Sequence, residues 1–483
     1  MPRVLTALRP SPTLWAMAYA VVLLVRVWGA HRFLHVEDSL MTAAVRTLPW
    51  TAVWDDHAYG FFVQWAIVEA TAWLPLAWAP PLLVAITCLV WWVCAMWLRT
   101  SVERVCSGGI AAGLVGLGLC MIPMPEIAYL GLAQAAGWPL AAAAIVAVLL
   151  DGPRVPWIQR IEVAAIAIVA ASHPTGLVIF VLALARRVAR IGVSTVNVSR
   201  AGAACVGIVV SWWVSRVQDP PLAYLGAWAP QDPWERDVQA RLVGAGASID
   251  RSVSVRNPLD VVTMFPGSVR FVVTQLLPEP WAAEAILAKS TMTKMLQILV
   301  PLGGCALLVL AVRRLDEVRR LETSRCVARG LASGGVVSIL VQHVLVGQLT
   351  SRQYLFLPLM LGWSAILVVL GEAFDSRSWR VFALMAVPFL WYATVVGQNF
   401  RDSFQDNPRQ GGTGRYAQAD LWGPALEEAR AKCRTREADA VVVVSQMDPN
   451  SPGVQQMIRS NGLRFAWFDH ALVIRCKAIG GTT

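Results

Sequence analysis

The chain has 483 residues, of which 56% are hydrophobic and only 15% are charged. With a mean hydropathy of +0.54, it cannot bury its apolar surface in one water-soluble core, so the composition indicates a membrane domain. The formal net charge is +10, but the basic residues form short clusters between apolar runs instead of one continuous stripe. We therefore expect no nucleic-acid partner.

Apolar runs recur along the chain at about the length that a helix needs to cross roughly 30 Å of hydrocarbon. The first run follows Arg3 and Arg9 without a small-residue cleavage site, so we interpret it as a retained anchor. The sequence predicts an all-α polytopic membrane protein with about eleven transmembrane helices. The runs are 13–30, 80–98, 109–124, 137–150, 161–172, 176–185, 201–216, 294–312, 330–348, 353–371 and 381–398.

The short runs 161–172 and 176–185 flank Ser172-His173-Pro174-Thr175-Gly176. They are either two spans joined by a tight hairpin or one re-entrant pair, and we favour two spans. Segment 60–79 is also apolar, but counting it as a span would invert every later loop. We expect it to lie along the surface as a juxtamembrane helix.

The distribution of Arg orients the chain. With 60–79 on the surface, alternate loops hold eighteen Arg, whereas the short loops on the other side hold only Arg32, Arg46 and Arg352. The positive-inside rule makes the Arg-rich side cytoplasmic. The N-terminus is then cytoplasmic, and loop 31–79, loop 217–293, the tail and all six His are extracytoplasmic. Lys occurs at only four positions, a skew that a GC-rich, actinobacterium-like genome would produce.

Two domains are expected. Residues 1–398 form the transmembrane domain, with the first extracytoplasmic loop at 31–79 and a large one at 217–293. Residues 399–483 form a small extracytoplasmic α/β domain, with strands in 440–446 and 464–476 and a short helix at 451–460. Cys433 and Cys476 lie in this domain, and whether they pair as a disulfide is left open.

The first outer loop holds two acidic pairs, Glu37-Asp38 and Asp55-Asp56, followed by His57. Adjacent carboxylates at a membrane face suit a general base that takes a proton from an acceptor hydroxyl. The second carboxylate would orient the base or bind a divalent cation such as Mg²⁺, Mn²⁺ or Ca²⁺. The alternative is a solvated loop whose acids only keep it outside.

The order of these features resembles the GT-C glycosyltransferases, integral-membrane enzymes with a catalytic acid in the first extracytoplasmic loop. The resemblance covers most of residues 1–400. Its residues are Asp38, Tyr59-Gly60, Pro123-Met124-Pro125-Glu126 with Gln134 and Trp138, His173-Pro174, and Arg352-Gln353-Tyr354. The chain departs from many such enzymes in having Glu-Asp as its first pair and Gln353 between Arg352 and Tyr354.

The resemblance implies an inverting membrane transferase of the bacterial cytoplasmic membrane. It would move a hexosyl or pentosyl group from a polyprenyl-phosphate donor to a glycan, lipid or protein acceptor of the cell envelope. Asp38 is the expected base, with Glu37 as the alternative.

A lipid-linked donor keeps its phosphate at headgroup depth, where Arg26, Arg32 and Arg352 are expected. Tyr354, His343 and His173 are further candidates for this donor site. Either His could instead be a satisfied structural residue, and Arg26 could be an interfacial Arg that reaches toward the headgroups. Candidates for a second acid or for acceptor binding are Glu126, Asp55, Asp56 and His57.

Three alternatives remain. A flippase of a lipid-linked glycan would line a path with the same charges. A polysaccharide polymerase or ligase would use a large Arg-bearing outer loop, and Arg236, Arg241, Arg251 and Arg256 lie in 217–293. A membrane scaffold would have no chemistry at all.

Overall fold

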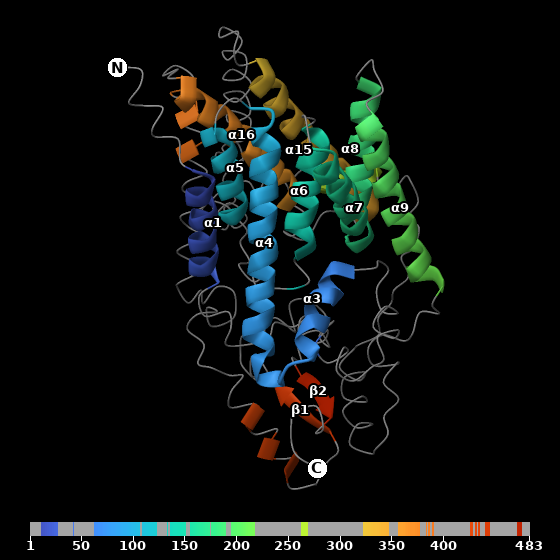
Figure 1. Ribbon diagram of the computed structural model, residues 1–483. Coiled ribbons are helices and arrows are strands. Elements are labelled where there is room, and N and C mark those ends of the chain that lie inside the picture. Colours follow the sequence, from blue (N-terminus) through green and yellow to red (C-terminus); the bar gives the residue numbers. More distant parts are fainter. Residues whose placement is uncertain are drawn as a thin grey trace, which may run out of the picture.

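The computed structural model describes residues 11–27, 62–106, 109–122, 136–150, 155–173, 175–189, 195–217, 262–268, 322–346, 356–376, 440–444 and 471–475, together with scattered single positions. Within these ranges the chain forms a helical bundle and one pair of strands (Figure 1). The helices are α1 (Pro12–Arg26), α3 (Phe62–Ala72), the short 3-10 helix η4 (Leu76–Trp78), α4 (Ala79–Glu103), α5 (Gly109–Cys120), α6 (Gly137–Leu149), α7 (Pro156–Ser172), α8 (Gly176–Ala189), α9 (Thr195–Val217), α15 (Glu322–Val346) and α16 (Phe356–Ser376).

Apolar runs and proline positions explain where most helices lie and begin. Helices α1, α4 and α7 begin with Pro in the first turn, where the missing N–H has no partner in a helix and φ is already helical. The α1 terminus is also capped, because the Ser11 hydroxyl accepts the Leu14 N–H at 3.2 Å. Nine of the eleven predicted runs coincide with described helices, whereas 294–312 and most of 381–398 lie outside the described residues.

Three described helices are long and apolar enough to cross a membrane: Leu76–Glu103, Val327–Val344 and Phe356–Phe374. Five shorter apolar helices lie beside them, from α1, α5, α6, α8 and α9. The topology of eleven spans stays a prediction. Helix α3 has 11 residues, or about 16 Å at 1.5 Å per residue. That is shorter than the bilayer, but α5 and α6 are of similar length, so the placement of 60–79 along the surface stays a prediction.

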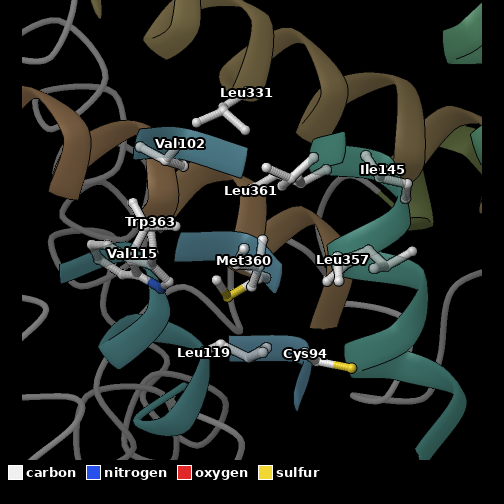
Figure 2. Close-up of a cluster of buried hydrophobic side chains, with 14 of the residues drawn as sticks. Cys94, Val102, Val115, Leu119, Ile145, Leu331, Leu357, Met360, Leu361 and Trp363 are labelled. Atoms are coloured by element: carbon white, nitrogen blue, oxygen red, sulfur yellow. The ribbon is translucent and has the colours of Figure 1, made fainter. Parts of the chain in front are cut away.

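The core lies between α4, α5, α6, α15 and α16. Figure 2 shows Cys94 and Val102 of α4, Leu119 of α5, Ile145 of α6 and Met360 of α16 in one apolar cluster. Small residues let these helices approach closely. A Cβ added at Gly371 of α16 would overlap backbone atoms of Ala111 in α5, so only glycine permits this approach.

The bundle has two distinct ends. Helix α4 extends beyond α5 and α6 toward α3 (Figure 1), and we call this the α3 end. Contacts between helix ends give their directions. Helix α6 begins at the α7–α8 turn, since Gly137 meets His173, and α1 and α5 end together at Arg26 and Cys120. Helix α16 runs antiparallel to α5, since Gly371 near its end meets Ala111 near the start of α5. Helices α1, α5, α7 and α15 therefore end at the α3 end, whereas α4, α6, α8 and α16 begin there. The structure joins two of these termini directly, since the Arg26 guanidinium at the end of α1 donates to the Cys120 carbonyl at the end of α5.

The described part of the tail contains two strands, β1 (Ala440–Val444) and β2 (Ala471–Arg475), which pair antiparallel with Ala440 opposite Arg475. Both strands lie inside segments expected to be strands. Cys433, also in the tail, is disulfide-bonded, and Cys476 is the residue after β2. The rest of 399–483 is largely outside the described residues, so the α/β domain stays a prediction.

Candidate functional site

Most of the predicted site residues cannot be placed. Those that lie outside the described residues are Glu37, Asp38, Arg32, Asp55, Asp56, His57, Glu126, Arg352 and Tyr354, and their roles stay predictions. His173, His343 and Arg26 are described, and each is buried.

His173 forms the turn between α7 and α8. Its Nδ1 lies 2.6 Å from the Thr175 hydroxyl and accepts the Thr175 backbone N–H at 3.3 Å. An Nδ1 that accepts places the proton of the neutral ring on Nε2. Burial lowers the pKa of His173 from 6.5 to about 3, because the charged ring would lose its hydration. The turn therefore presents a neutral imidazole.

Residues at the start of α6 also pack against His173. Trp138 packs against the imidazole with ring centroids 4.4 Å apart and an interplanar angle of 66°. A Cβ on Gly137 would overlap both the His173 ring and the Gln64 amide, so glycine is required where these two side chains meet. Gln64 comes from α3 and is buried.

Helix α3 is fixed to the same turn. The Val63 N–H donates to the Ser172 hydroxyl at 3.2 Å, and this hydroxyl in turn donates to the Ile168 carbonyl at 2.6 Å. The first loop leaves α1 after Arg26 and returns at Phe62, so it begins and ends at the α3 end.

A row of aromatic rings continues from His173 into the bundle. Trp138 lies 6.0 Å from Phe356, the first residue of α16, and Phe356 packs edge-on against Trp91 of α4 at 5.6 Å. We call His173, Trp138, Phe356 and Trp91 the aromatic row. All four are at least nine-tenths buried. The row joins α4, α6, α16 and the α7–α8 turn, which are distant in sequence.

His343 belongs to a second buried cluster near the end of α15. Its Nδ1 lies 2.8 Å from the Ser268 hydroxyl, and Phe265 packs against its ring at 5.2 Å and 67°. Residues 262–268, which carry these two partners, are helical and lie within the predicted loop 217–293. The structure thus brings part of the large loop against a candidate donor-site His.

Arg26 has a structural role. Besides the Cys120 carbonyl, it donates to the Ile122 carbonyl at 3.3 Å. Carbonyls at a helix C-terminus have no partner within the helix and carry partial negative charge, so a buried guanidinium satisfies them. The sequence did not predict this contact, and phosphate binding by Arg26 stays a prediction.

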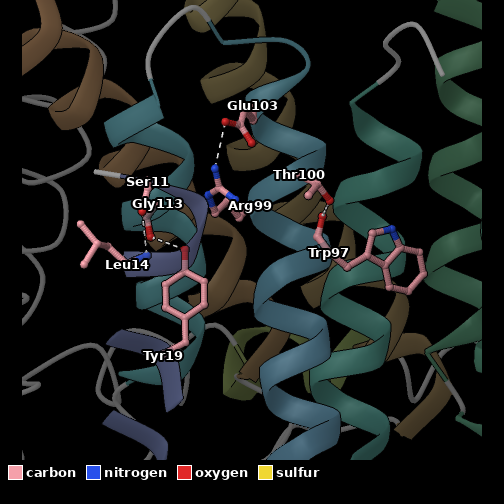
Figure 3. Close-up of polar contacts among 8 residues, drawn as sticks. All are labelled: Ser11, Leu14, Tyr19, Trp97, Arg99, Thr100, Glu103 and Gly113. Carbon is pink, nitrogen blue, oxygen red and sulfur yellow. Dashed lines mark hydrogen bonds and ion pairs between the residues drawn. The ribbon is translucent and has the colours of Figure 1, made fainter. Parts of the chain in front are cut away.

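Charged residues at the opposite end form ion pairs within the protein. Figure 3 shows Arg99 and Glu103 of α4 paired at 2.9 Å. Glu162 of α7 pairs with Arg200 of α9 at 2.8 Å, with both side chains buried, and also accepts the Trp97 indole N–H at 3.2 Å. The Arg99–Glu103 pair lies within α4, whereas the two contacts of Glu162 join α4, α7 and α9.

Sequence reasoning missed Gln64 and Trp91. Gln64 could have been found, because a lone polar residue in an apolar segment such as FFVQWAIV faces protein more often than lipid. Trp91 has no such signal, since its place in the row depends on contact with α16. Within the described ranges, no three His, Cys, Asp or Glu side chains are grouped to hold a metal ion.

No known protein family matches this sequence, and no curated protein is similar to it.

Proposed function

We propose that the chain is a multi-pass membrane glycosyltransferase of the GT-C type. It would transfer a sugar from a polyprenyl-phosphate donor to a cell-envelope glycan, lipid or protein on the extracytoplasmic face of the bacterial cytoplasmic membrane. The observation that carries this proposal is the convergence at the α3 end: α3, which follows the acidic first loop in the chain, is hydrogen-bonded to the turn that carries His173, and this turn joins the aromatic row. Aromatic rings beside neutral hydrogen-bonding groups suit a sugar.

The exposed surface supports a membrane setting. One face of α1 presents Leu14, Met17, Val21 and Leu24, each 58–60% exposed, an arrangement that suits lipid contact rather than water. At the α3 end, four Trp side chains are more than half exposed. These are Trp73, Trp78, Trp212 and Trp213, and such Trp residues are typical of a membrane–water interface.

The proposed reaction is a single displacement. The acceptor hydroxyl oxygen bonds to the anomeric carbon, the carbon–oxygen bond to the phosphate breaks, and polyprenyl phosphate leaves. The Asp38 carboxylate takes the hydroxyl proton, with Glu37 orienting it or sharing the role. Arg352 and Arg32 would stabilise the departing phosphate. Carboxylates of the first loop could bind a divalent cation, because such ions prefer oxygen ligands.

The test is an assay that separates transfer from translocation. The purified chain is placed in liposomes with polyprenyl-phosphate sugars and envelope acceptors, and both a new glycosidic bond and movement of the donor between leaflets are measured. We expect transfer by the wild type and a loss of at least about a hundredfold in Asp38→Asn or Glu37→Gln, the range that general-base catalysis supplies.

Glu69→Gln is the matched control, because Glu69 is a carboxylate of α3 outside the proposed site, and its activity should be unchanged. Translocation without a new bond would instead favour the flippase. Unchanged transfer by both first-loop variants would overturn the assignment of the base.

A further inference from the structure

Several buried neutral polar groups have no hydrogen-bond partner among the described residues, and three of them lie toward the α3 end. These three are the Trp91 indole N–H, the Thr87 hydroxyl, and the Gln342 amide, of which neither the oxygen nor the nitrogen is paired. Thr87 is fully buried, and Trp91 and Gln342 are each only 2% exposed. Buried polar groups without partners are rare because they lose hydrogen bonds to water and gain none in return. A ligand that supplies the missing bonds would explain all three.

Trp91 belongs to the aromatic row, and Thr87 lies next to it. Thr87 precedes Trp91 by four residues, so both lie on one face of α4. Trp91 is the end of the row farthest from His173, in edge-on contact with Phe356. The unpaired N–H and hydroxyl therefore lie next to flat apolar ring surfaces.

Gln342 comes to the same end of the bundle from α15. A Cβ on Gly335 would lie 3.3 Å from the Pro358 carbonyl of α16, so this face of α15 packs on the first turns of α16. Gln342 is seven residues, or two turns, after Gly335 on that face. It therefore lies toward the α3 end, where Phe356 begins α16.

The chemistry of these groups selects a ligand class. Trp91 only donates, whereas Thr87 and the Gln342 amide both donate and accept. None is charged, and the His173 ring at the other end of the row is neutral, so the groups suit alcohol oxygens better than a phosphate. We propose that Trp91, Thr87 and Gln342 form a subsite that binds the hydroxyls of the donor's sugar ring, with Phe356 and Trp138 packing against its apolar face. This inference rests on the proposed function and assigns recognition of the sugar to residues outside the first loop.

Binding of matched lipids tests the subsite. The full-length chain in lipid nanodiscs is titrated with polyprenyl-phosphate glucose, polyprenyl-phosphate arabinose and bare polyprenyl phosphate. The variants are Thr87→Val and Gln342→Leu, which keep approximately the same shape without the polar atoms, and Trp91→Phe, which keeps an aromatic ring and removes the indole N–H. We expect each to weaken binding of the preferred sugar-bearing lipid by about tenfold, with binding of bare polyprenyl phosphate within about twofold of wild type.

The chain offers close controls. The Trp92 indole already donates to the Ala16 carbonyl at 2.9 Å, and the Ser338 hydroxyl to the Gly335 carbonyl at 2.7 Å. Trp92→Phe and Ser338→Ala should therefore leave the preference for the sugar-bearing lipid intact. Melting without ligand checks folding. Thr87→Val and Gln342→Leu should melt no lower than wild type because they replace unpaired groups by apolar groups of similar shape, whereas Trp91→Phe should melt lower because it leaves a cavity.

Two results would overturn the subsite while the proposed function stands. In one, the wild type prefers the sugar-bearing lipid and all three variants keep that preference, so their polar atoms contact only water. In the other, the variants bind the sugar-bearing lipid and bare polyprenyl phosphate more weakly by the same factor, so the three residues contact the phosphate or the polyprenyl tail. A wild type that binds neither sugar-bearing lipid better than bare polyprenyl phosphate would overturn the proposed function and this inference together.

Discussion

His173 is a titratable residue that the fold keeps neutral. Its Nδ1 accepts from Thr175, Trp138 covers one side of the ring, and burial lowers its pKa to about 3. A neutral imidazole cannot pair with phosphate as a cation, so its contribution to a donor site is hydrogen bonding and ring contact. If His173 belongs to a donor site, we therefore expect it to act there by hydrogen bonding and ring contact only.

The lowered pKa predicts how stability depends on pH. Between pH 6.5 and pH 3 the unfolded chain binds a proton at His173 that the folded chain does not, so stability is fully present above pH 6.5 and falls as pH is lowered through this window. We expect the melting temperature in detergent to fall by a few degrees from pH 7 to pH 5. His173→Asn, which cannot titrate, should flatten this part of the curve. Parallel curves for the two proteins would contradict a buried neutral His173.

The ion pair between Glu162 and Arg200 joins α7 to α9, so substitutions at these residues test how strongly the two helices are coupled. Glu162→Gln leaves the Arg200 charge buried without its counter-charge, and we expect a loss of about 3–5 kcal/mol in unfolding free energy. Glu162→Gln combined with Arg200→Met removes both charges and should recover most of that loss. The melting temperatures of the two single variants and the double variant measure this coupling, and additive losses would show that the pair does not act as a unit.

The close contact between α5 and α16 gives a second test. A Cβ at Gly371 would overlap backbone atoms of Ala111, which cannot move aside as a flexible side chain can. Gly371→Ala should lower the unfolding free energy by about 1–3 kcal/mol, the usual cost of overpacking. Gly362, also in α16, has open space around its Cβ position, so Gly362→Ala should be neutral or slightly stabilising. Equal effects of the two substitutions would mean that the helices pack differently.

The helices themselves could be predicted from the sequence, but their contacts could not. Continuous apolar runs predicted nine described helices because lipid and a helical bundle both require apolar surface over many turns. The same runs carry little information on pairing, since Leu, Val and Ala suit any neighbour. That Trp91 of α4 touches Phe356 of α16, or that Gly371 faces Ala111, depends on the whole bundle. Of the site, the sequence identified His173 and Trp138, and it missed Gln64 and Gln342 although each is a polar residue in an apolar run.

At the scale of the whole molecule, the Cys433 disulfide supports an extracytoplasmic tail, because disulfides persist in oxidising compartments. When the protein is taken from intact membranes, we expect Cys433 to react with maleimide only after the disulfide has been reduced. Cys476→Ser should make it label without reduction if Cys476 is the partner. If Cys433 of the unreduced wild type reacts with maleimide, then the disulfide is not formed in the membrane, and the argument for an extracytoplasmic tail fails. Buried Cys94 and Cys120 should label only after unfolding and serve as the internal control.

The proposed orientation would put the α3 end, the first loop and the tail on one face of the membrane. A donor whose lipid stays in the bilayer would then present its phosphate to the first loop and its sugar to the aromatic row. This division of roles is the central claim: charged residues of the loops bind the phosphate, and neutral residues of the bundle bind the sugar.

The most direct test of this claim is an experimental structure of the full chain in lipid nanodiscs with polyprenyl phosphate bound. We expect the phosphate at the α3 end, in contact with Arg352 and beside the Asp38 carboxylate, with the aromatic row next to the position that the sugar would occupy. A phosphate at the opposite end, or a first loop folded away from His173 and Trp138, would contradict it.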